Sequence, residues 1–404
     1  MEYLFTERAH LMCPNMCFGI VTSVNRPFDE CGIKEAADVL ADAHPFLKAL
    51  LGYEEEGNAY YYRITDKSQT EVVVQNGEIT GSDAPEVLEE YGRLAAVARN
   101  LFREGMLRII AWKAGEKTVF LMVFDHLLAD GRGALALAEE LANYYVSGIR
   151  PGFAEEKLIS SKDDFPADSR MPLISRLLVS RANREWRREN RIVSYEQYLS
   201  FAEEFLRRDP VRHRLSLIEE AGLSEIIEEC RRHQVTVNDY LLAKLFLEED
   251  IGKIIIAGDL RDRLGCYRKG ALGNYSTAFS VKIRKREKDL FSLARTIHAT
   301  VREIMRRPSE LYLVLQCYAN LDPGLLDAAL IASRGGFESK AAKFIGTMFF
   351  GFGAPVGYSI TNLGRLENTA VDSAFFIPPA SPAIRKTIGV LTLNGRTCLC
   401  TSER

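Results

Sequence analysis

The chain of 404 residues is 47% hydrophobic and 26% charged, a composition typical of globular proteins and sufficient for two domains. Its formal net charge of -3 leaves no excess of cations, which argues against a nucleic-acid partner and favours a small molecule or a protein. Eight cysteines are too sparse for a disulfide framework, no group of residues has metal-ligand spacing, and no uncharged apolar run could span a bilayer, so we expect a cytoplasmic protein without a metal.

Strand and helix patterns alternate through the first 150 residues. Apolar and β-branched runs predict strands at 19–24, 60–64, 70–74, 106–113 and 117–124. Apolar residues at helical spacing predict three helices: one capped by Asp29 and ending at His44, one over 84–103, and one beyond Gly133 that stops near Gly148.

The segment 166–212 differs in character, because it combines prolines with a cluster of arginines at positions 170, 176, 181, 184, 187, 188 and 191. We interpret it as a basic helical crossover between an N-terminal half, 1–165, and a C-terminal half, 213–404. The arginines have three readings: a solvated helix face, a surface for coenzyme A phosphates or an acidic carrier protein, and a basic amphipathic helix on an anionic membrane.

In the second half, the order of strands and helices predicted for the first half begins again. Strands are predicted at 215–217, 253–257, 276–283, 358–361 and 388–393, and helices at 223–233, 237–247, 290–305 and 310–319. Thr236 is a good N-cap for the second of these helices. No sequence repeat is visible, but two α+β halves of similar size are compatible with a structural repeat.

The stretch TVFLMVFDHLLADGRGA, residues 118–134, carries the strongest functional signal. A fully apolar strand leads through a core and ends in polar residues, so His126 is expected at a strand-to-helix junction beside a crevice. Histidine there suits general base catalysis, although a satisfied structural histidine is the alternative reading. Asp130 either orients the loop through an ion pair or caps the next helix. The remaining histidines at 10, 213, 233 and 298 are expected on solvated surfaces, and His44 at a helix end.

DHLLADG resembles the HxxxDG signature of nonribosomal peptide synthetase condensation domains, alcohol acetyltransferases and related CoA-dependent acyltransferases. Four further stretches resemble the same proteins in the same order: FDECGIKEAADVLADAHPFLKAL, SLIEEAGLSEIIEECRRHQVTVNDYLLAKLF, DLRDRLGCYRKGALGNYS and GYSITNLGRLE. Together the five stretches span most of the chain. The resemblance implies an α/β fold of two chloramphenicol-acetyltransferase-like halves that form a pseudo-dimer with a central tunnel.

The resemblance also implies roles for individual residues. His126 would remove a proton from an alcohol or amine as that group attacks a thioester, and Asp130 would support the site in an ion pair with Arg261, or with Arg263 as the fallback. Gly131 belongs to the same motif. Residues expected along the tunnel are Asn274, Ser359, Thr361 and Asn362.

The sequence departs from the family pattern at two places. Condensation domains usually carry a second histidine before the catalytic one, where this chain has Asp125, whose carboxylate could favour the charged imidazole. After 389–399 the chain ends in CTSER, where the family usually has a further helix, so one edge of the fold is expected to be trimmed.

The leading hypothesis is a monomeric O- or N-acyltransferase that uses acyl-CoA as co-substrate, a small alcohol or amine as acceptor, and no permanently bound cofactor. One alternative is a freestanding condensation enzyme whose donor is a phosphopantetheine thioester on an acyl carrier protein. Another is a catalytically silent tunnel protein that binds a ligand or a partner. Contact with a membrane surface is the least favoured partner reading, and nucleotide hydrolysis has no motif to support it.

Overall fold

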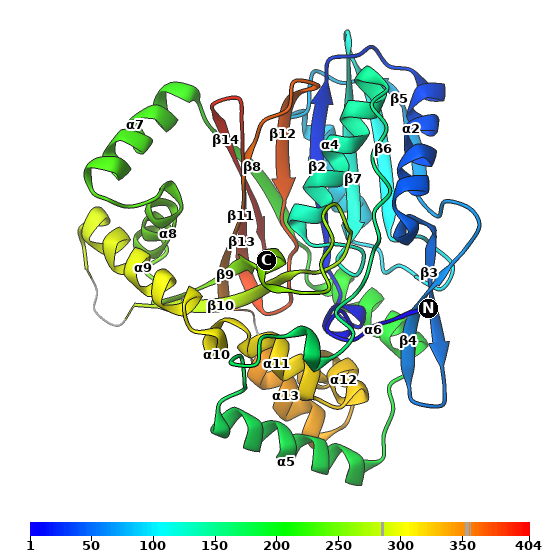
Figure 1. The fold of residues 1–404 in the computed structure, drawn as a ribbon, viewed down its shortest axis with the longest axis vertical. Coiled ribbons are helices and arrows are strands. Elements are labelled where there is room, and N and C mark those ends of the chain that lie inside the picture. The colour runs from blue at the N-terminus through cyan, green and yellow to red at the C-terminus, as the bar shows by residue number, and fades with distance from the viewer. Residues whose placement is uncertain (284–286, 352–354, 356) are drawn as a thin grey trace.

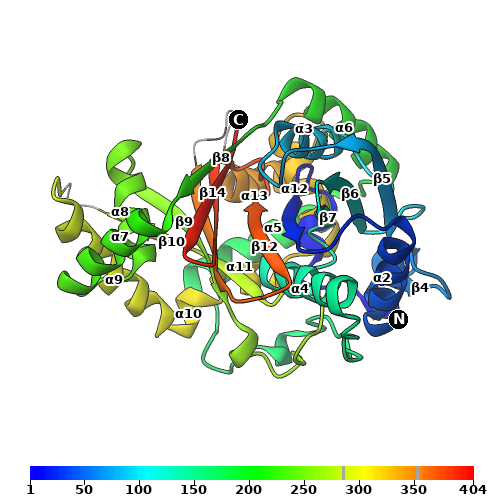
Figure 2. The same cartoon turned by 90° about the horizontal axis from the view of Figure 1, so that it is seen from above.

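The computed structural model describes residues 1–283, 287–351, 355 and 357–404. Figure 1 shows two α/β halves side by side, with a group of helices beneath them. Seen from above in Figure 2, helices α7, α8 and α9 lie on the side of the second half that points away from the first half. In the described part of the chain, no helix is both long enough and apolar enough to cross a membrane.

The first half and the crossover contain seven short or medium strands and six α-helices. In chain order they are β1 (Glu2–Tyr3), α1 (Arg8–Leu11), β2 (Cys17–Val24), α2 (Glu30–Ala43), β3 (Ala49–Glu54), β4 (Ala59–Ile64), β5 (Glu71–Glu78), α3 (Pro85–Ala95), β6 (Leu107–Ala114), β7 (Lys117–Asp125), α4 (Gly131–Ser147), α5 (Leu173–Glu189) and α6 (Tyr195–Arg208).

The second half begins with β8. Its elements are β8 (Arg212–Ile218), α7 (Glu220–Arg232), α8 (Val237–Glu248), β9 (Lys253–Asp259), β10 (Ser276–Lys282), α9 (Leu290–Met305), α10 (Pro308–Leu311), α11 (Leu313–Asn320), α12 (Pro323–Ser333), α13 (Lys340–Phe350), β11 (Gly357–Leu366), β12 (Val371–Ile377), β13 (Ile384–Leu393) and β14 (Arg396–Glu403). Three short 3₁₀ turns complete the described elements.

Each half is built around one mixed sheet. The first sheet has the order β12-β2-β7-β6-β5 and the second the order β10-β9-β11-β13-β14-β8, while β1, β4 and β3 form a small separate sheet. Among the strands that the structure describes, parallel pairing is confined to β5 with β6 and to β11 with its neighbours β9 and β13. The α/β fold predicted from the sequence is confirmed.

Strand β7 is apolar from Val119 to Phe124 because both of its faces are buried there. Phe120, Met122 and Phe124 belong to the main core, and the alternate residues Val119 and Leu121 belong to a second cluster beneath α3. Successive side chains of a strand point to opposite faces, so a strand covered on both sides reads as one continuous hydrophobic run. The run therefore ends where the chain leaves the core, at Asp125.

One strand crosses between the halves. β12 follows β11 in the second half but pairs antiparallel with β2, at the edge of the first sheet. At the crossing β12 and β13 approach closely, since a Cβ atom on Gly389 would lie 2.6 Å from the carbonyl oxygen of Phe376. The two halves thus share main-chain hydrogen bonds. The domain boundaries at 165 and 212 stay predictions.

Several elements differ from their predicted bounds. The helix predicted over 84–103 ends at Ala95, and the helix predicted over 310–319 is divided into α10 and α11. The prediction of a trimmed edge at the C-terminus is wrong. The last residues belong to β14, which is an interior strand paired with β13 and with β8. The edges of that sheet are β10 and β8.

Candidate functional site

His126 lies in the short connection between β7 and α4, the strand-to-helix junction that the sequence predicts. Main-chain hydrogen bonds hold this connection from both neighbouring segments. The N–H of Asp125 donates to the carbonyl oxygen of Met106, and the N–H of His126 donates to that of Met16, both at 2.8 Å. The backbone of the histidine is therefore fixed to the first sheet, and its side chain is half-buried.

Asn274 determines which nitrogen of His126 carries a hydrogen. Its Nδ2 donates to the carbonyl oxygen of His126 at 2.7 Å, and a carbonyl oxygen can only accept. The other end of the amide, Oδ1, consequently faces Nδ1 of His126 at 2.9 Å and must accept from it. With the hydrogen on Nδ1, the lone pair of the neutral imidazole is on Nε2.

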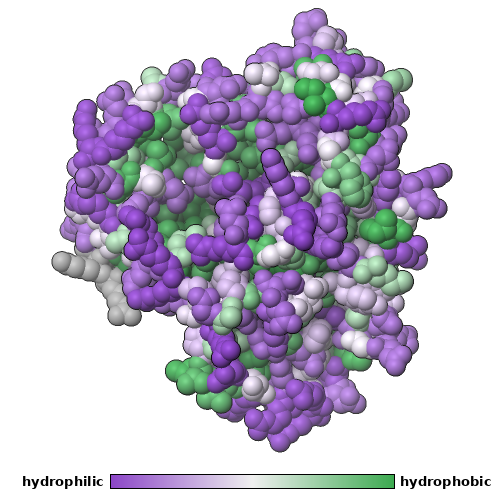
Figure 3. All heavy atoms as spheres, viewed as in Figure 1, coloured by the Kyte–Doolittle hydropathy of each residue, from purple (hydrophilic) through white to green (hydrophobic). Residues whose placement is uncertain are grey.

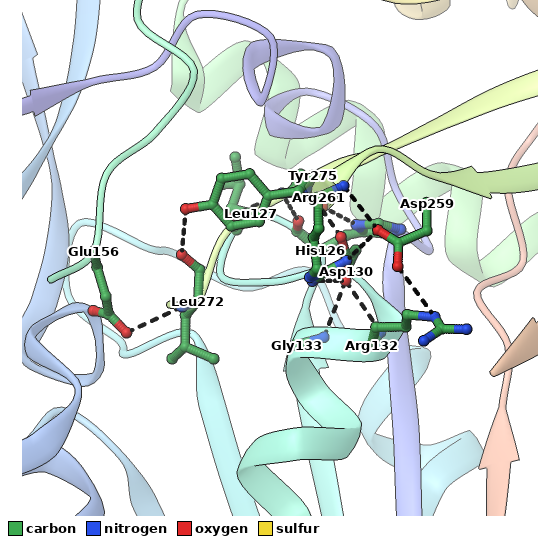
Figure 4. Close-up of polar contacts among 11 residues, drawn as sticks. His126, Leu127, Asp130, Arg132, Gly133, Glu156, Asp259, Arg261, Leu272 and Tyr275 are labelled. Atoms are coloured by element: carbon green, nitrogen blue, oxygen red, sulfur yellow. Dashed lines mark hydrogen bonds and ion pairs between the residues drawn. The ribbon is translucent and has the colours of Figure 1, made fainter. Parts of the chain in front are cut away.

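Asp130 is the centre of a buried network, shown in Figure 4. Its Oδ1 accepts from the N–H groups of Arg132 and Gly133, at 3.1 and 3.0 Å, which caps α4. The same oxygen accepts from Nη2 of Arg261 at 2.7 Å, and Oδ2 accepts from the N–H of Tyr275 at 2.9 Å. Each of these partners donates a hydrogen bond to the carboxylate, which gives Asp130 a structural position.

The structure pairs Asp130 with Arg261, whereas Arg263 donates to the carbonyl oxygen of Met305 instead. The segment that carries Asn274 is joined to the same junction by its main chain, because the N–H of Asp130 donates to the carbonyl oxygen of Gly273 at 3.1 Å. Gly273 has a φ of +139°, which a residue with a side chain rarely adopts. A glycine therefore allows the turn that presents Asn274 to His126.

A third predicted motif also reaches the junction. A Cβ atom on Gly131 would lie 2.7 Å from Cδ2 of Leu363, so Leu363 packs directly against this glycine. HxxxDG, the Gly-Asn segment and the Thr-Asn-Leu-Gly segment of β11 are thus brought together from three distant parts of the chain. A side chain at position 131 would require the Leu363 side chain to shift.

Ser359 and Thr361 are half-buried on one face of β11, while the tyrosine and the isoleucine that alternate with them are buried in the core of the second half. Asn362 is held locally, since its Oδ1 accepts from the N–H of Gly364 at 2.8 Å and its Nδ2 donates to Asn238 at 3.3 Å. Their position along a tunnel stays a prediction. Asn274, in contrast, is buried and bonded to His126.

Asp125 is hydrogen-bonded locally and not to His126. Its Oδ1 accepts from the N–H of Leu127 at 3.0 Å, and within the described residues no hydrogen bond or ion pair joins it to His126. Burial raises the pKa of the Asp125 carboxyl, and the Leu127 N–H, the Arg99 guanidinium and the nearby His126 act in the opposite direction. The side chain lines a small cavity of about 50 Å³ together with Arg99, Cys17 and His10.

His10 is the residue of this site that the sequence analysis missed. The prediction of a solvated surface is wrong for it, because its ring stacks on that of His126 with centroids 4.4 Å apart and planes 11° apart. Burial and the adjacent His126 hold the pKa of His10 well below its ordinary value, so His10 is neutral near pH 7. His213 is also withdrawn from solvent, and burial lowers its pKa to about 4.

His44 belongs to a buried network that reaches the segment carrying Asn274. It is buried, and its two ring nitrogens contact Glu156 at 3.0 Å and Glu140 at 2.6 Å. Glu156 in turn accepts from the N–H of Phe46 at 2.6 Å and from that of Leu272 at 3.3 Å, two positions before Asn274. Burial opposes a charge on His44, but the hydrogen bonds to the two carboxylates outweigh it and raise the pKa of His44 to about 9.

This raised pKa predicts a loss of stability at alkaline pH. The folded pKa of His44 lies above its ordinary value, so its contribution is complete below about pH 6.5 and is lost as the pH rises through 9. We expect a loss on the order of 3 kcal/mol in the free energy of unfolding, measured by urea denaturation between pH 6 and 10. His44→Gln should remove this pH-dependent difference. A constant difference between the two proteins across that range would contradict the prediction.

No family model and no curated protein sequence matches this chain. Its fold is similar to that of polyketide synthase associated protein 5 from Mycobacterium tuberculosis, with a TM-score of 0.60, 14% identity, and coverage of 100% of this chain and 92% of that protein. It is also similar to the first condensation domain of the calcium-dependent antibiotic synthetase, with a TM-score of 0.59, 13% identity, and coverage of 100% and 91%.

A third similar structure is the epimerization domain from the third module of tyrocidine synthetase B, with a TM-score of 0.53, 14% identity, and coverage of 99% and 88%. These identities are low, so the likeness concerns the fold. It extends over the whole chain. The chain therefore has the condensation-domain fold of two chloramphenicol-acetyltransferase-like halves.

Proposed function

We propose that this chain transfers an acyl group from a thioester to a small alcohol or amine, with Nε2 of His126 as the general base. One observation carries the proposal: the hydrogen bond from Nδ1 of His126 to Oδ1 of Asn274, which leaves the lone pair on Nε2. A fixed tautomer and a fixed ring orientation are what a general base needs, because proton transfer requires the acceptor lone pair to face the substrate.

The proposed reaction needs no group besides the two substrates. Nε2 takes the proton from the acceptor O–H or N–H as the oxygen or nitrogen attacks the thioester carbonyl carbon. The carbon–sulfur bond then breaks, and the leaving thiolate receives the proton from His126. The products are an ester or amide and a free thiol, and His126 returns to its neutral form.

The stacked ring of His10 is compatible with this role. It covers one face of the imidazole of His126, while the reacting lone pair lies in the plane of the ring, at its edge. Phe18 contacts His126 edge-on, with centroids 5.2 Å apart. These two neighbours restrict rotation of the ring, so they add to the orientation that Asn274 provides.

The experiment that tests the proposal is a transfer assay with the full chain. A panel of acyl-CoA donors, and separately acyl groups on a holo-acyl carrier protein, is offered to pooled alcohols and amines, and free thiol release is measured. Release that requires an acceptor supports acyl transfer, and the productive donor distinguishes an acyl-CoA enzyme from a freestanding condensation enzyme. No acceptor-dependent release from either donor class would contradict the proposal and favour a silent tunnel protein.

Asn274→Ala is expected to lower kcat about 5- to 10-fold with little change in KM. Without Oδ1 the hydrogen moves freely between the two ring nitrogens, and the loss corresponds to about one hydrogen bond. Steady-state kinetics with the productive donor measures the effect.

Asn320→Ala is the matched control, because Asn320 is a half-buried asparagine that bonds Gln316 and Lys162 instead of His126. Its kcat is expected to stay near that of the wild type. Equal losses in the two variants would show that Asn274 does not act through His126.

A further inference from the structure

Helix α5 (Leu173–Glu189) lies at the lower edge of the molecule in Figure 1, where it packs against α13 and α11. Its inward side is formed by Val179, Ala182 and Trp186, which are buried. At 1.5 Å per residue its 17 residues extend about 25 Å. The opposite side of the helix is therefore a long, convex and open surface.

That outward face begins with three large aliphatic side chains. Leu173, Ile174 and Leu177 are 66%, 74% and 70% exposed. Such exposure of adjacent aliphatic residues costs free energy in water and marks an interaction surface more often than a neutral one. Figure 3 shows hydrophobic surface at one end of this edge of the molecule and hydrophilic surface along the rest of it.

The remainder of the outward face is cationic. At 3.6 residues per turn, Arg181, Arg184 and Arg188 lie within the same arc of about 100° as the three aliphatic residues. Of the seven arginines between 170 and 191, only Arg188 makes an ion pair in the described part of the chain, with Glu185 at 3.7 Å. The chain as a whole carries a net charge of -3, so this concentration of positive charge is local.

We propose that the outward face of α5 docks on an anionic phospholipid surface. The arginines complement phosphate groups, and the aliphatic side chains at the first turns enter the boundary between headgroups and acyl chains. A convex helix whose aliphatic side chains protrude suits lipid, because a fluid lipid surface needs no complementary pocket. The proposal is independent of the acyl transfer chemistry.

The test is sedimentation of the full chain with vesicles. We expect binding to vesicles of phosphatidylglycerol and phosphatidylcholine, little binding to phosphatidylcholine alone, and weaker binding as salt is raised, since surface charges are screened. R181Q/R184Q/R188Q should weaken binding about 100-fold, at roughly fivefold for each arginine. L173S/I174S/L177S should weaken it at least about tenfold.

A matched control removes the same charge elsewhere. R207Q/R231Q/R232Q changes exposed arginines on α6 and α7 and should bind vesicles like the wild type, with circular dichroism confirming that every variant is folded. The proposal is wrong if the wild type does not sediment with anionic vesicles, or if the control variant loses as much binding as the α5 variants. Retention by an acidic holo-acyl carrier protein through the α5 arginines, without vesicle binding, would also overturn it in favour of a protein interface.

Discussion

Replacing His126 with alanine is expected to lower kcat/KM for acyl transfer by about 10²- to 10⁴-fold, the usual contribution of general base catalysis. This corresponds to about 3–5 kcal/mol of transition-state stabilisation. Thiol release with the productive donor and acceptor measures the effect. Nδ2 of Asn274 donates to the main-chain carbonyl oxygens of residues 126 and 127, and alanine keeps these acceptors. The fold should therefore survive the change, which thermal unfolding of the variant checks.

The matched control is His10→Phe. His10 stacks on His126, so it is the other imidazole that could serve as the base. Phenylalanine keeps an aromatic ring at that position and removes the titratable nitrogen atoms. We expect this variant to retain activity within about tenfold, because the stack contributes orientation alone. Loss of activity in His10→Phe with retention in His126→Ala would assign the base to His10 and refute our proposal.

The sequence predicts the local features of the site well because these depend on neighbouring residues. The apolar run of β7 and the cap at Asp130 are encoded within about fifteen positions. The order of five motifs along the chain was sufficient to predict the fold, which the structural comparisons confirm. Pattern and resemblance thus placed His126 at the correct kind of junction.

Long-range contacts could not be derived in the same way. His10 lies in a four-residue helix near the N-terminus. No pattern in the neighbouring sequence indicates that its ring would stack on that of His126. The Gly-Asn segment was expected to line the tunnel, and only the folded chain shows Asn274 bonded to the imidazole. Such pairings depend on tertiary packing, which no local periodicity records.

Two missed elements illustrate a different limit. α12 is buried on all sides, so its sequence PGLLDAALIAS has no polar face and no amphipathic period. β12 has the length and apolar character of a strand, but its partner β2 lies in the other half of the molecule. The prediction of two separate halves therefore did not include a strand of the second half that pairs with the sheet of the first half.

Asp130→Ala is expected to lower the free energy of unfolding by about 3–5 kcal/mol, the cost of removing one partner of a buried ion pair. Among the described residues, Arg261 would keep only the more exposed Asp259 as a carboxylate partner, and the N–H of Tyr275 would lose its acceptor. The cap of α4 would be lost as well. Chemical denaturation of the wild type and the variant measures the difference.

Asp259→Ala provides the control, since it removes the other carboxylate that contacts Arg261. The Asp259 side chain is partly exposed, and in the described part of the chain it contacts Arg132 and Arg261 rather than Tyr275, so we expect a loss below about 1 kcal/mol. The two variants should also differ in kcat, because Asp130 joins the His126 junction to that segment through Tyr275. Equal destabilisation by the two substitutions would mean that Arg261 depends on Asp259 instead, and that the aspartate of HxxxDG does not hold the two halves of the site together.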